Sequence, residues 1–436
     1  MAPVDAEAYW LAPKTRSDQF LLFAFDAAEP RDVGTLRAGL IGRARSIPDL
    51  NLAVRETFAY LDFPYWVPCP ARESQVVARD PAGSAWQDCL DDVASLISEQ
   101  LDPRREAWRV HLYPTVLGLP DGTVRGSVAV LQISHALADG RGSTALARQL
   151  FGTDVNVDSG FGGGFRGPAA AAIGGLVRLP IRWSITVGRG WRAFRLSRDD
   201  PAGPAAVSPG PLNVAPGEDR QLRVVVVDAE RLRIGQHGVT VGAIMAISDA
   251  LAGARILSGD ERLVVELTIG RASDGLARNN FHTAAVDSHC EIADRDRRAD
   301  AIAQSIEDAR RRDAAPGRAA SRRATEATPA FLMRWGAGAF DPAVRSSMVT
   351  GHTVVSSVNR GAADLTLAGG RVLFTTGFPA LSVMQGATHG VHGIGSTVAL
   401  SVTTSRRVLP DVDGYVDVLC RVCASGPNSL PSDTGE

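Results

Sequence analysis

The chain has 436 residues, which is more than one hydrophobic core ordinarily accommodates, so two domains of roughly 200 residues each are expected. Hydrophobic residues make up 45% of the sequence and charged residues 22%, proportions typical of a globular protein. The 46 basic and 48 acidic residues leave a formal charge of −2, which gives no global reason to expect nucleic acid as a partner. A small molecule or another protein is expected instead.

The cysteines and the N-terminus indicate a cytoplasmic protein. Five cysteines are few and odd in number, and the first ten residues, MAPVDAEAYW, lack the basic and apolar regions of a signal peptide. Cys420 and Cys423 form a C-x-x-C pair, but the sequence has no second pair or histidine cluster near them. Because a structural zinc ion needs four ligands, we predict no metal site.

The first part of the chain alternates apolar strands with amphipathic helices. Residues 20–25 (FLLFAF) predict a buried strand, and residues 33–45 and 86–99 predict helices, because their apolar side chains lie three and four apart. Residues 109–116 and 126–133 predict a hairpin, since the Asp-Gly of the intervening LPDGT is a strong turn signal.

Residues 128–150 (VAVLQISHALADGRGSTALARQL) predict a buried strand, a tight loop and a helix. His135 follows the strand, where its ring is shielded on one side and reachable on the other, so it can serve as a base near neutral pH. The alternative is a partly buried structural histidine. Asp139 and Gly140 favour the catalytic interpretation, because they allow a tight loop with an ionic contact that fixes the imidazole.

Residues 159–216 are predicted to connect two halves. Residues 159–170 are rich in glycine and are not expected to hold a fixed structure, whereas residues 200–216 are rich in proline and predicted to be extended. Residues 170–195 are apolar and carry five arginines and no acidic residue. A basic amphipathic segment of this kind can make peripheral contact with a membrane, or it can be a helix packed on its own domain, which we favour.

The second half predicts a further set of strands and helices. Strands are predicted at residues 221–227, 263–269, 353–358, 365–374 and 395–403. Helices are predicted at residues 241–254 and 297–314, and a turn followed by a helix ends the ordered chain. Residues 315–328, rich in alanine, arginine and threonine, are expected to be mobile.

The H-x-x-x-D-G loop of His135, Asp139 and Gly140 resembles that of the CoA-dependent acyltransferase superfamily, which includes chloramphenicol acetyltransferase and nonribosomal-peptide condensation domains. Four later blocks are similar, in order, to those of the bacterial wax ester synthase/diacylglycerol acyltransferase group. They are SPGPLNVAPGEDRQLRVVVVDAERLRIGQHGVTVGAIMAISDAL, LTIGRASDGLARNNF, SSVNRGAADLTLAGGRV and STVALSVTTSRRVLPDVDGYVD. The resemblance covers most of residues 100–425.

The resemblance implies an α/β fold of two chloramphenicol-acetyltransferase-like subdomains, each a mixed sheet with helices, and an active-site tunnel between them. We assign residues 1–158 to the N-terminal subdomain, residues 159–216 to a crossover linker and residues 217–436 to the C-terminal subdomain. The implied activity is acyl transfer to an alcohol or amine, with acyl-CoA as a co-substrate and no bound cofactor. The product would be a wax ester, an acylglycerol or an ester of a specialised metabolite.

The resemblance also implies roles for single residues. His135 would act as general base, and Asp139 would turn away from the substrate and pair with an arginine, for which Arg271 is the candidate. Gly140 would allow the tight loop. The side chains considered for contact with the substrate or its oxyanion are Ser134, Asn279, Asn280, Ser356 and Ser357.

The sequence departs from the pattern of the group at four places. Ser134 replaces the first of two histidines, and Gly242-Ala243 replaces an Asn-Asp pair. Ser357 replaces an Asn, and Asn359-Arg360 replaces a Pro-Gly pair. The lipid character of the substrate therefore stays open. Two alternatives remain: a condensation-type enzyme that takes its acyl group from an acyl carrier protein, and a noncatalytic member of the fold that binds a ligand or partner.

Overall fold

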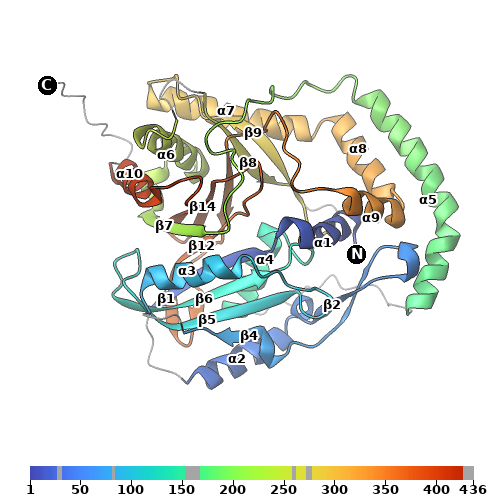
Figure 1. Ribbon diagram of the computed structural model, residues 1–436, viewed down its shortest axis with the longest axis horizontal. Coiled ribbons are helices and arrows are strands. Elements are labelled where there is room, and N and C mark those ends of the chain that lie inside the picture. The colour runs from blue at the N-terminus through green and yellow to red at the C-terminus, as the bar shows by residue number, and fades with distance from the viewer. Residues whose placement is uncertain (27–31, 81–83, 153–166, 258–261, 272–276, 426–436) are drawn as a thin grey trace.

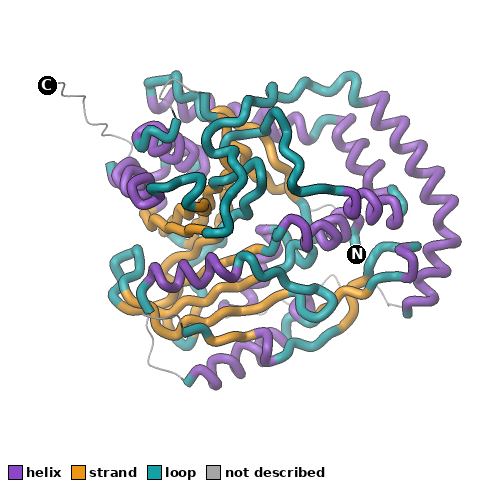
Figure 2. The backbone as a smooth tube through the Cα atoms, in the orientation of Figure 1, coloured by secondary structure: helices purple, strands orange, loops and turns teal. Residues whose placement is uncertain are grey.

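The structure, a computed structural model, describes residues 1–26, 32–80, 84–152, 167–257, 262–271 and 277–425. Most of the glycine-rich segment predicted at residues 159–170 lies outside them. Two sheets occupy the lower and upper halves of the molecule in Figure 1. Figure 2 shows helices covering both sheets, and one long helix stands along the outer edge.

The lower sheet is formed by strands of the first half together with two strands from far along the chain. Within the described residues the strand order is β11-β12-β1-β6-β5-β4. The bounds are β1 (Gln19–Asp26), β4 (Val76–Ala78), β5 (Trp108–Leu117), β6 (Arg125–Ile133), β11 (Thr366–Leu367) and β12 (Gly370–Gly377). The predicted strand at residues 20–25 and the predicted hairpin are confirmed, because β5 and β6 pair antiparallel and β6 pairs antiparallel with β1.

The helices of the first half are α1 (Pro3–Thr15), α2 (Val33–Arg45), α3 (Trp86–Leu96) and α4 (Gly140–Phe151). The helices predicted at residues 33–45 and 86–99 are α2 and α3. Leu90 and Val93 of α3 are buried, as their spacing predicts. A small two-stranded sheet pairs β2 (Leu52–Arg55) with β3 (Tyr65–Pro68).

The upper sheet has the order β7-β14-β13-β10-β8-β9 within the described residues. Its strands are β7 (Arg220–Asp228), β8 (Val264–Gly270), β9 (Phe281–Asp287), β10 (Thr353–Asn359), β13 (Thr388–Ile394) and β14 (Thr397–Ser405). The helices α6 (Val239–Gly253), α7 (Arg295–Asp313) and α10 (Val412–Ala424) accompany it. Ile244, Ile247 and Leu251 of α6 are buried in its core, as predicted.

The strand β12 belongs to the second half of the sequence but lies in the lower sheet. It pairs antiparallel with β1, with Phe23 opposite Thr375. The division predicted at residues 158 and 217 therefore does not divide the two sheets, because residues 366–377 cross back. The sequence pattern of β12 shows an extended buried strand, but a strand's own residues do not reveal which sheet it joins.

Two helices follow α7, where the sequence suggested mobile chain. Residues 315–328 form α8 (Pro316–Ala327), and α9 (Ala330–Ala339) packs against α1. The expectation of mobility was wrong because α8 packs along α5 (Pro168–Leu196), where the hydroxyl of Thr186 donates to the carbonyl of Ala327 at 2.8 Å. None of the described helices is long and apolar enough to cross a membrane.

Candidate active site

His135 lies in the turn that follows β6, at the junction of the two halves. The strand is buried on both faces, so the chain leaves the sheet core directly before the half-buried imidazole. The Nδ1 atom of His135 lies 2.6 Å from Oδ1 of Asn279, which precedes β9. The ring of Phe281 packs beside the imidazole, with 5.4 Å between the ring centroids.

The contact with Asn279 determines which imidazole nitrogen carries the proton. The Nδ2 atom of Asn279 donates to Oδ1 of Asp5 at 3.0 Å and to the main-chain carbonyl of His135 at 2.7 Å. Because both of these partners only accept, the amide oxygen must be the atom that faces the ring. Nδ1 of His135 is therefore the donor, and Nε2 of the neutral ring is left as a proton acceptor.

Asp5 of α1 holds this segment of the second half in place. The side chain is almost fully buried, and its carboxylate accepts hydrogen bonds from the main-chain N–H groups of Arg278, at 3.0 Å, and Asn279, at 2.9 Å. Burial raises the pKa of Asp5, opposed by these hydrogen bonds. Asp5 was not among the predicted site residues, because α1 itself has weak apolar periodicity and was not predicted.

Asp139 fixes the loop from the other side. It is the N-cap of α4, and its Oδ1 accepts from the N–H groups of Arg141 at 3.0 Å and Gly142 at 2.9 Å. Its Oδ2 accepts from the N–H of Asn280 at 2.9 Å. The carboxylate therefore joins the start of α4 to the second half, and Gly140 is the first residue of that helix.

The predicted pair of Asp139 with Arg271 is not formed. The guanidinium of Arg271 binds both carboxylate oxygens of Asp313, each at 2.7 Å, and donates to the carbonyl of Phe281 at 2.6 Å. The prediction was wrong because three main-chain N–H groups already satisfy Asp139, so the carboxylate needs no cation. Arg271 instead ties the end of β8 to α7.

The predicted substrate contacts fall into different surroundings. Ser134 is fully buried, and its hydroxyl has no hydrogen-bond partner among the described residues. Ser357 binds the hydroxyl of Thr240 at 2.8 Å, on the face of β10 that meets α6. Ser356 points to the opposite face, because side chains alternate along a strand. That face also carries Val358, whose methyl lies 3.5 Å from where a Cβ on Gly140 would be.

A pocket with a strongly basic lining lies at the loop that leads into β5. Its volume is about 550 Å³, and it is lined by Arg55, Cys69, Arg72, Asp102, Arg104 and Arg105. Asp102 forms an ion pair with Arg104, so one of the four arginines is neutralised. The loop is close to the histidine turn along the sheet, since the N–H of Ser134 donates to the carbonyl of Ala107. The pocket can accept a multiply charged anion.

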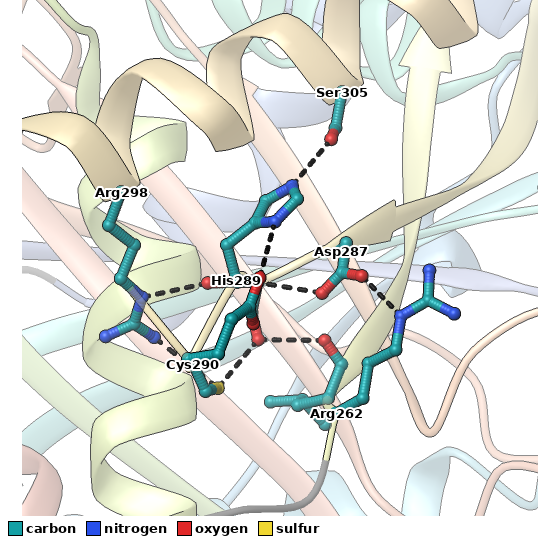
Figure 3. A network of polar contacts seen from close by, with 9 residues as sticks. Arg262, Asp287, His289, Cys290, Arg298 and Ser305 are labelled. Carbon is teal, nitrogen blue, oxygen red and sulfur yellow. Dashed lines mark hydrogen bonds and ion pairs between the residues drawn. The ribbon is translucent and has the colours of Figure 1, made fainter. Parts of the chain in front are cut away.

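A second polar cluster lies after β9, away from His135, and is drawn in Figure 3. Asp287, His289 and Glu291 bring potential metal ligands within 4.8 Å of one another. Two of them already have protein partners, because Asp287 forms an ion pair with Arg262 and His289 Nε2 lies 3.0 Å from the hydroxyl of Ser305. The geometry is that of a hydrogen-bonded link between β9 and α7.

Arg360 is an unusual residue at the boundary of the halves. The side chain is almost fully buried, and within the described residues it has no carboxylate partner. It donates to the hydroxyl of Thr144 at 3.0 Å and lies over the ring of Phe23. Burial lowers the pKa of Arg360 to about 9.

The two-sheet architecture and the histidine loop agree with the fold of the CoA-dependent acyltransferase superfamily, which the sequence resemblance predicted. Residues 1–160 match the family model described as the wax ester synthase/diacylglycerol acyltransferase catalytic domain. No curated protein matches the chain.

Several solved structures share the fold. The wax ester synthase/diacylglycerol acyltransferase from Marinobacter aquaeolei VT8 is 17% identical with a TM-score of 0.60, and the similarity covers 97% of each chain. The starter condensation domain of rhizomide synthetase, solved with C8-CoA and Leu-SNAC, is 10% identical with a TM-score of 0.57 over 99% of this chain and 96% of the other. The trichothecene 15-O-acetyltransferase from Fusarium sporotrichioides is 12% identical with a TM-score of 0.53 over 96% and 93%.

Proposed function

We propose that the protein transfers an acyl group from acyl-CoA to an alcohol or amine, with His135 as the general base. One observation carries the proposal: the hydrogen bond from Nδ1 of His135 to Asn279 leaves Nε2 as the proton acceptor. A base whose tautomer is fixed by a neighbour is what general-base catalysis needs. The matched family model and the shared fold support acyl transfer as the class of reaction.

In the proposed mechanism, Nε2 of His135 takes the proton of the acceptor hydroxyl or amine while the acceptor's oxygen or nitrogen attacks the thioester carbonyl. The tetrahedral adduct then collapses, the carbon–sulfur bond breaks, and the imidazolium returns the proton to the CoA sulfur. No covalent acyl-enzyme is formed. The hydrogen bond to Asn279 strengthens while the ring is charged, because charge-assisted hydrogen bonds are the stronger ones.

The oxyanion of the adduct needs a donor, and Ser356 is the candidate that we favour. Asn279 is used by His135 and Asp5, and Ser357 is bound to Thr240 on the far face of β10. The hydroxyl of Ser356 makes no hydrogen bond with the described residues, and it shares its face of β10 with Val358 beside the histidine loop. A serine hydroxyl in this position can rotate toward the oxyanion.

The arginine pocket supports CoA as the donor. Coenzyme A carries phosphates, which arginines bind through charge-assisted hydrogen bonds. We place the phosphates of the donor at Arg55, Arg72 and Arg105, with the pantetheine arm directed toward His135. A carrier protein with an acidic surface would find the same charges, so the carrier-bound donor is the second candidate.

The test is a panel of acyl-CoA donors with alcohol and amine acceptors, measured by free-thiol release. We expect turnover with wild-type protein and loss by at least about a hundredfold in His135→Ala. The matched control is His237→Ala, which removes a histidine that binds Asp300 at the surface and should leave turnover unchanged. Undiminished turnover by folded His135→Ala would contradict the mechanism. Binding of acyl-CoA in calorimetry with no thiol release would identify a noncatalytic protein.

The donor is tested in the same assay with acyl-CoA, an acylated carrier protein and a short acyl-N-acetylcysteamine thioester without phosphates. If the arginine pocket binds CoA, Arg72→Ser/Arg105→Ser raises KM for acyl-CoA but not for the short thioester. The control is Arg406→Ser/Arg407→Ser, two exposed arginines after β14. A preference for the acylated carrier protein over acyl-CoA would favour the condensation-type alternative.

A further inference from the structure

The long helix α5 exposes a row of large apolar side chains to solvent. It runs along the right edge of the molecule in Figure 1, outside both sheets. Each of these side chains has between 52% and 69% of its surface exposed: Ile173, Leu176, Val177, Ile181, Trp183, Val187, Trp191 and Phe194. Val187, Trp191 and Phe194 are four and three residues apart, so they share one face of the helix. Contiguous exposed apolar surface of this kind marks an interaction site.

The opposite face of α5 is firmly attached to the protein. Ala193 is buried, Thr186 binds α8, and Arg189 donates to the carbonyl of Arg323 at 3.0 Å. Gly175 lies so close to the carbonyl of Leu61 that a Cβ there would be only 2.3 Å from the oxygen. The inner face of α5 is therefore packed on its own protein, as the sequence favoured. The outer face remains uncovered.

The charges on α5 are of one sign. Residues 168–196 contain five arginines and no acidic residue. Arg178 and Arg182 lie 3.4 Å from the carboxylate of Asp62. Arg192 and Arg195 are exposed, and neither forms an ion pair with a described residue. Two cations beside an apolar row attract a surface that is both anionic and apolar.

We propose that the outer face of α5 docks onto the surface of an anionic lipid bilayer. The apolar side chains insert to the depth of the headgroups, while Arg192 and Arg195 contact lipid phosphates. Trp183 and Trp191 are suited to this position, because indole rings favour the boundary between water and hydrocarbon. The helix lies flat on the membrane, since its inner face is held to α8 in its C-terminal half and to residues 61–62 in its N-terminal half. The proposal does not depend on acyl transfer.

The charge pattern favours lipid over the other occupant that an apolar helix can have, a second copy of the chain. Across a two-fold axis α5 would face itself, and because residues 168–196 contain no acidic residue, the partner helix would offer no carboxylate to Arg192 and Arg195. An anionic membrane offers the opposite charge to both free arginines at once. Lipid is thus the occupant that satisfies both the apolar row and the cations.

The experiment measures cosedimentation of the full-length protein with phosphatidylcholine vesicles, with and without one third phosphatidylglycerol. We expect binding at least about tenfold tighter to the anionic vesicles, with a blue shift of tryptophan fluorescence. Val187→Asp should weaken binding by about tenfold or more. Its matched control is Val124→Asp, an even more exposed valine in the turn between β5 and β6, which should bind as wild type does. Arg192→Gln/Arg195→Gln should remove most of the preference for anionic vesicles, whereas Arg406→Gln/Arg407→Gln should not.

Thermal unfolding is measured for each variant to check that it is folded. We expect all of them to fold, because the substituted side chains are exposed. Equal loss of binding in Val187→Asp and Val124→Asp would overturn the proposal, because α5 would then have no special part. Equal affinity for both vesicle types would contradict the proposed preference for an anionic bilayer. Absence of vesicle binding, together with a dimer that Val187→Asp dissociates in light scattering, would assign the face to a second copy instead.

Discussion

Nδ1 of His135 donates a hydrogen bond to Oδ1 of Asn279 at 2.6 Å, and this contact joins the two halves of the chain at the proposed base. Asn279 is oriented in turn by Asp5, so three segments far apart in the sequence determine one tautomer. Catalysis by a general base depends on the position of the base as much as on its presence. The residues that hold His135 are thus expected to affect kcat.

Asn279→Ala is expected to lower kcat by about 10- to 100-fold and to leave KM for acyl-CoA nearly unchanged, because the ring loses its orientation but the donor site is intact. Steady-state kinetics measure the two constants separately. The control is Asn213→Ala, which removes another buried asparagine, one that donates to the carbonyl of Met384. That variant should lose stability but keep kcat. A change in KM alone for Asn279→Ala would contradict the positioning role.

Asp139→Ala is expected to lower the free energy of unfolding by about 2–4 kcal/mol, because it removes the cap of α4 and leaves the N–H of Asn280 without its acceptor. Urea denaturation measures the loss. Asp294→Ala is the comparison, since Asp294 caps α7 by accepting from the N–H of Arg297 at an exposed site. Asp294→Ala should lower the free energy of unfolding by only about 1 kcal/mol. Equal losses would show that the link to the second half contributes nothing.

Arg298→Met is expected to lower the free energy of unfolding, whereas Arg360→Met is not. Arg360 is buried without a carboxylate partner, so an apolar side chain of similar length should leave the free energy of unfolding unchanged or raise it by about 1–2 kcal/mol. Arg298 is also buried but binds Asp249 at 2.6 Å, and its removal should cost about 3 kcal/mol or more. Chemical denaturation of both variants decides the point. Similar losses would mean that Arg360 is stabilised where it lies.

Asp18 predicts a specific dependence of stability on pH. Burial raises its pKa to about 6, opposed by hydrogen bonds from the N–H of Leu101 and from Gln132. The folded protein thus holds this proton more tightly than the unfolded chain, whose pKa is near 3.8. The stabilisation is fully present below about pH 4 and is lost as the pH rises through 6.

Asp18→Asn cannot ionise, so it should avoid this loss and gain up to about 2 kcal/mol relative to wild type between pH 4 and pH 7.5. Denaturation curves of both proteins at the two pH values give the difference. Other titrating groups cancel in the comparison. A difference between variant and wild type that stays constant with pH would contradict the raised pKa.

Much of the fold follows from local pattern, and the exceptions have physical reasons. Apolar runs predict β1, β6 and β8, and apolar side chains at helical spacing predict α2 and α6. The strand β13 (THGVHGI) was not predicted, because glycine and histidine give it the composition of a loop, and its neighbours β10 and β14 hold it extended. The mobile segment expected at residues 315–328 became α8 through packing on α5, which its own sequence does not encode.

The candidate site divides in the same way. His135 and Asp139 belong to one short motif, so the sequence alone brings them together. Asp5 lies about 130 residues earlier in a helix that was not predicted, and its role depends on how the halves dock. Arg271 was assigned to Asp139 by proximity to a strand end, but its guanidinium binds Asp313. Partners across an interface depend on the folded geometry and not on spacing in the chain.

The position of β12 bears on synthesis of the protein at the ribosome. When residue 158 has emerged, β1 can pair with β6, but its other edge, from Leu21 to Phe25, waits for residues 370–377. At translation rates of about 5–20 residues per second, that edge stays open for roughly 10–40 s. An apolar strand with unpaired main-chain groups invites pairing with another nascent chain. Chaperones that shield this edge should therefore raise the yield of native protein more than those acting after release.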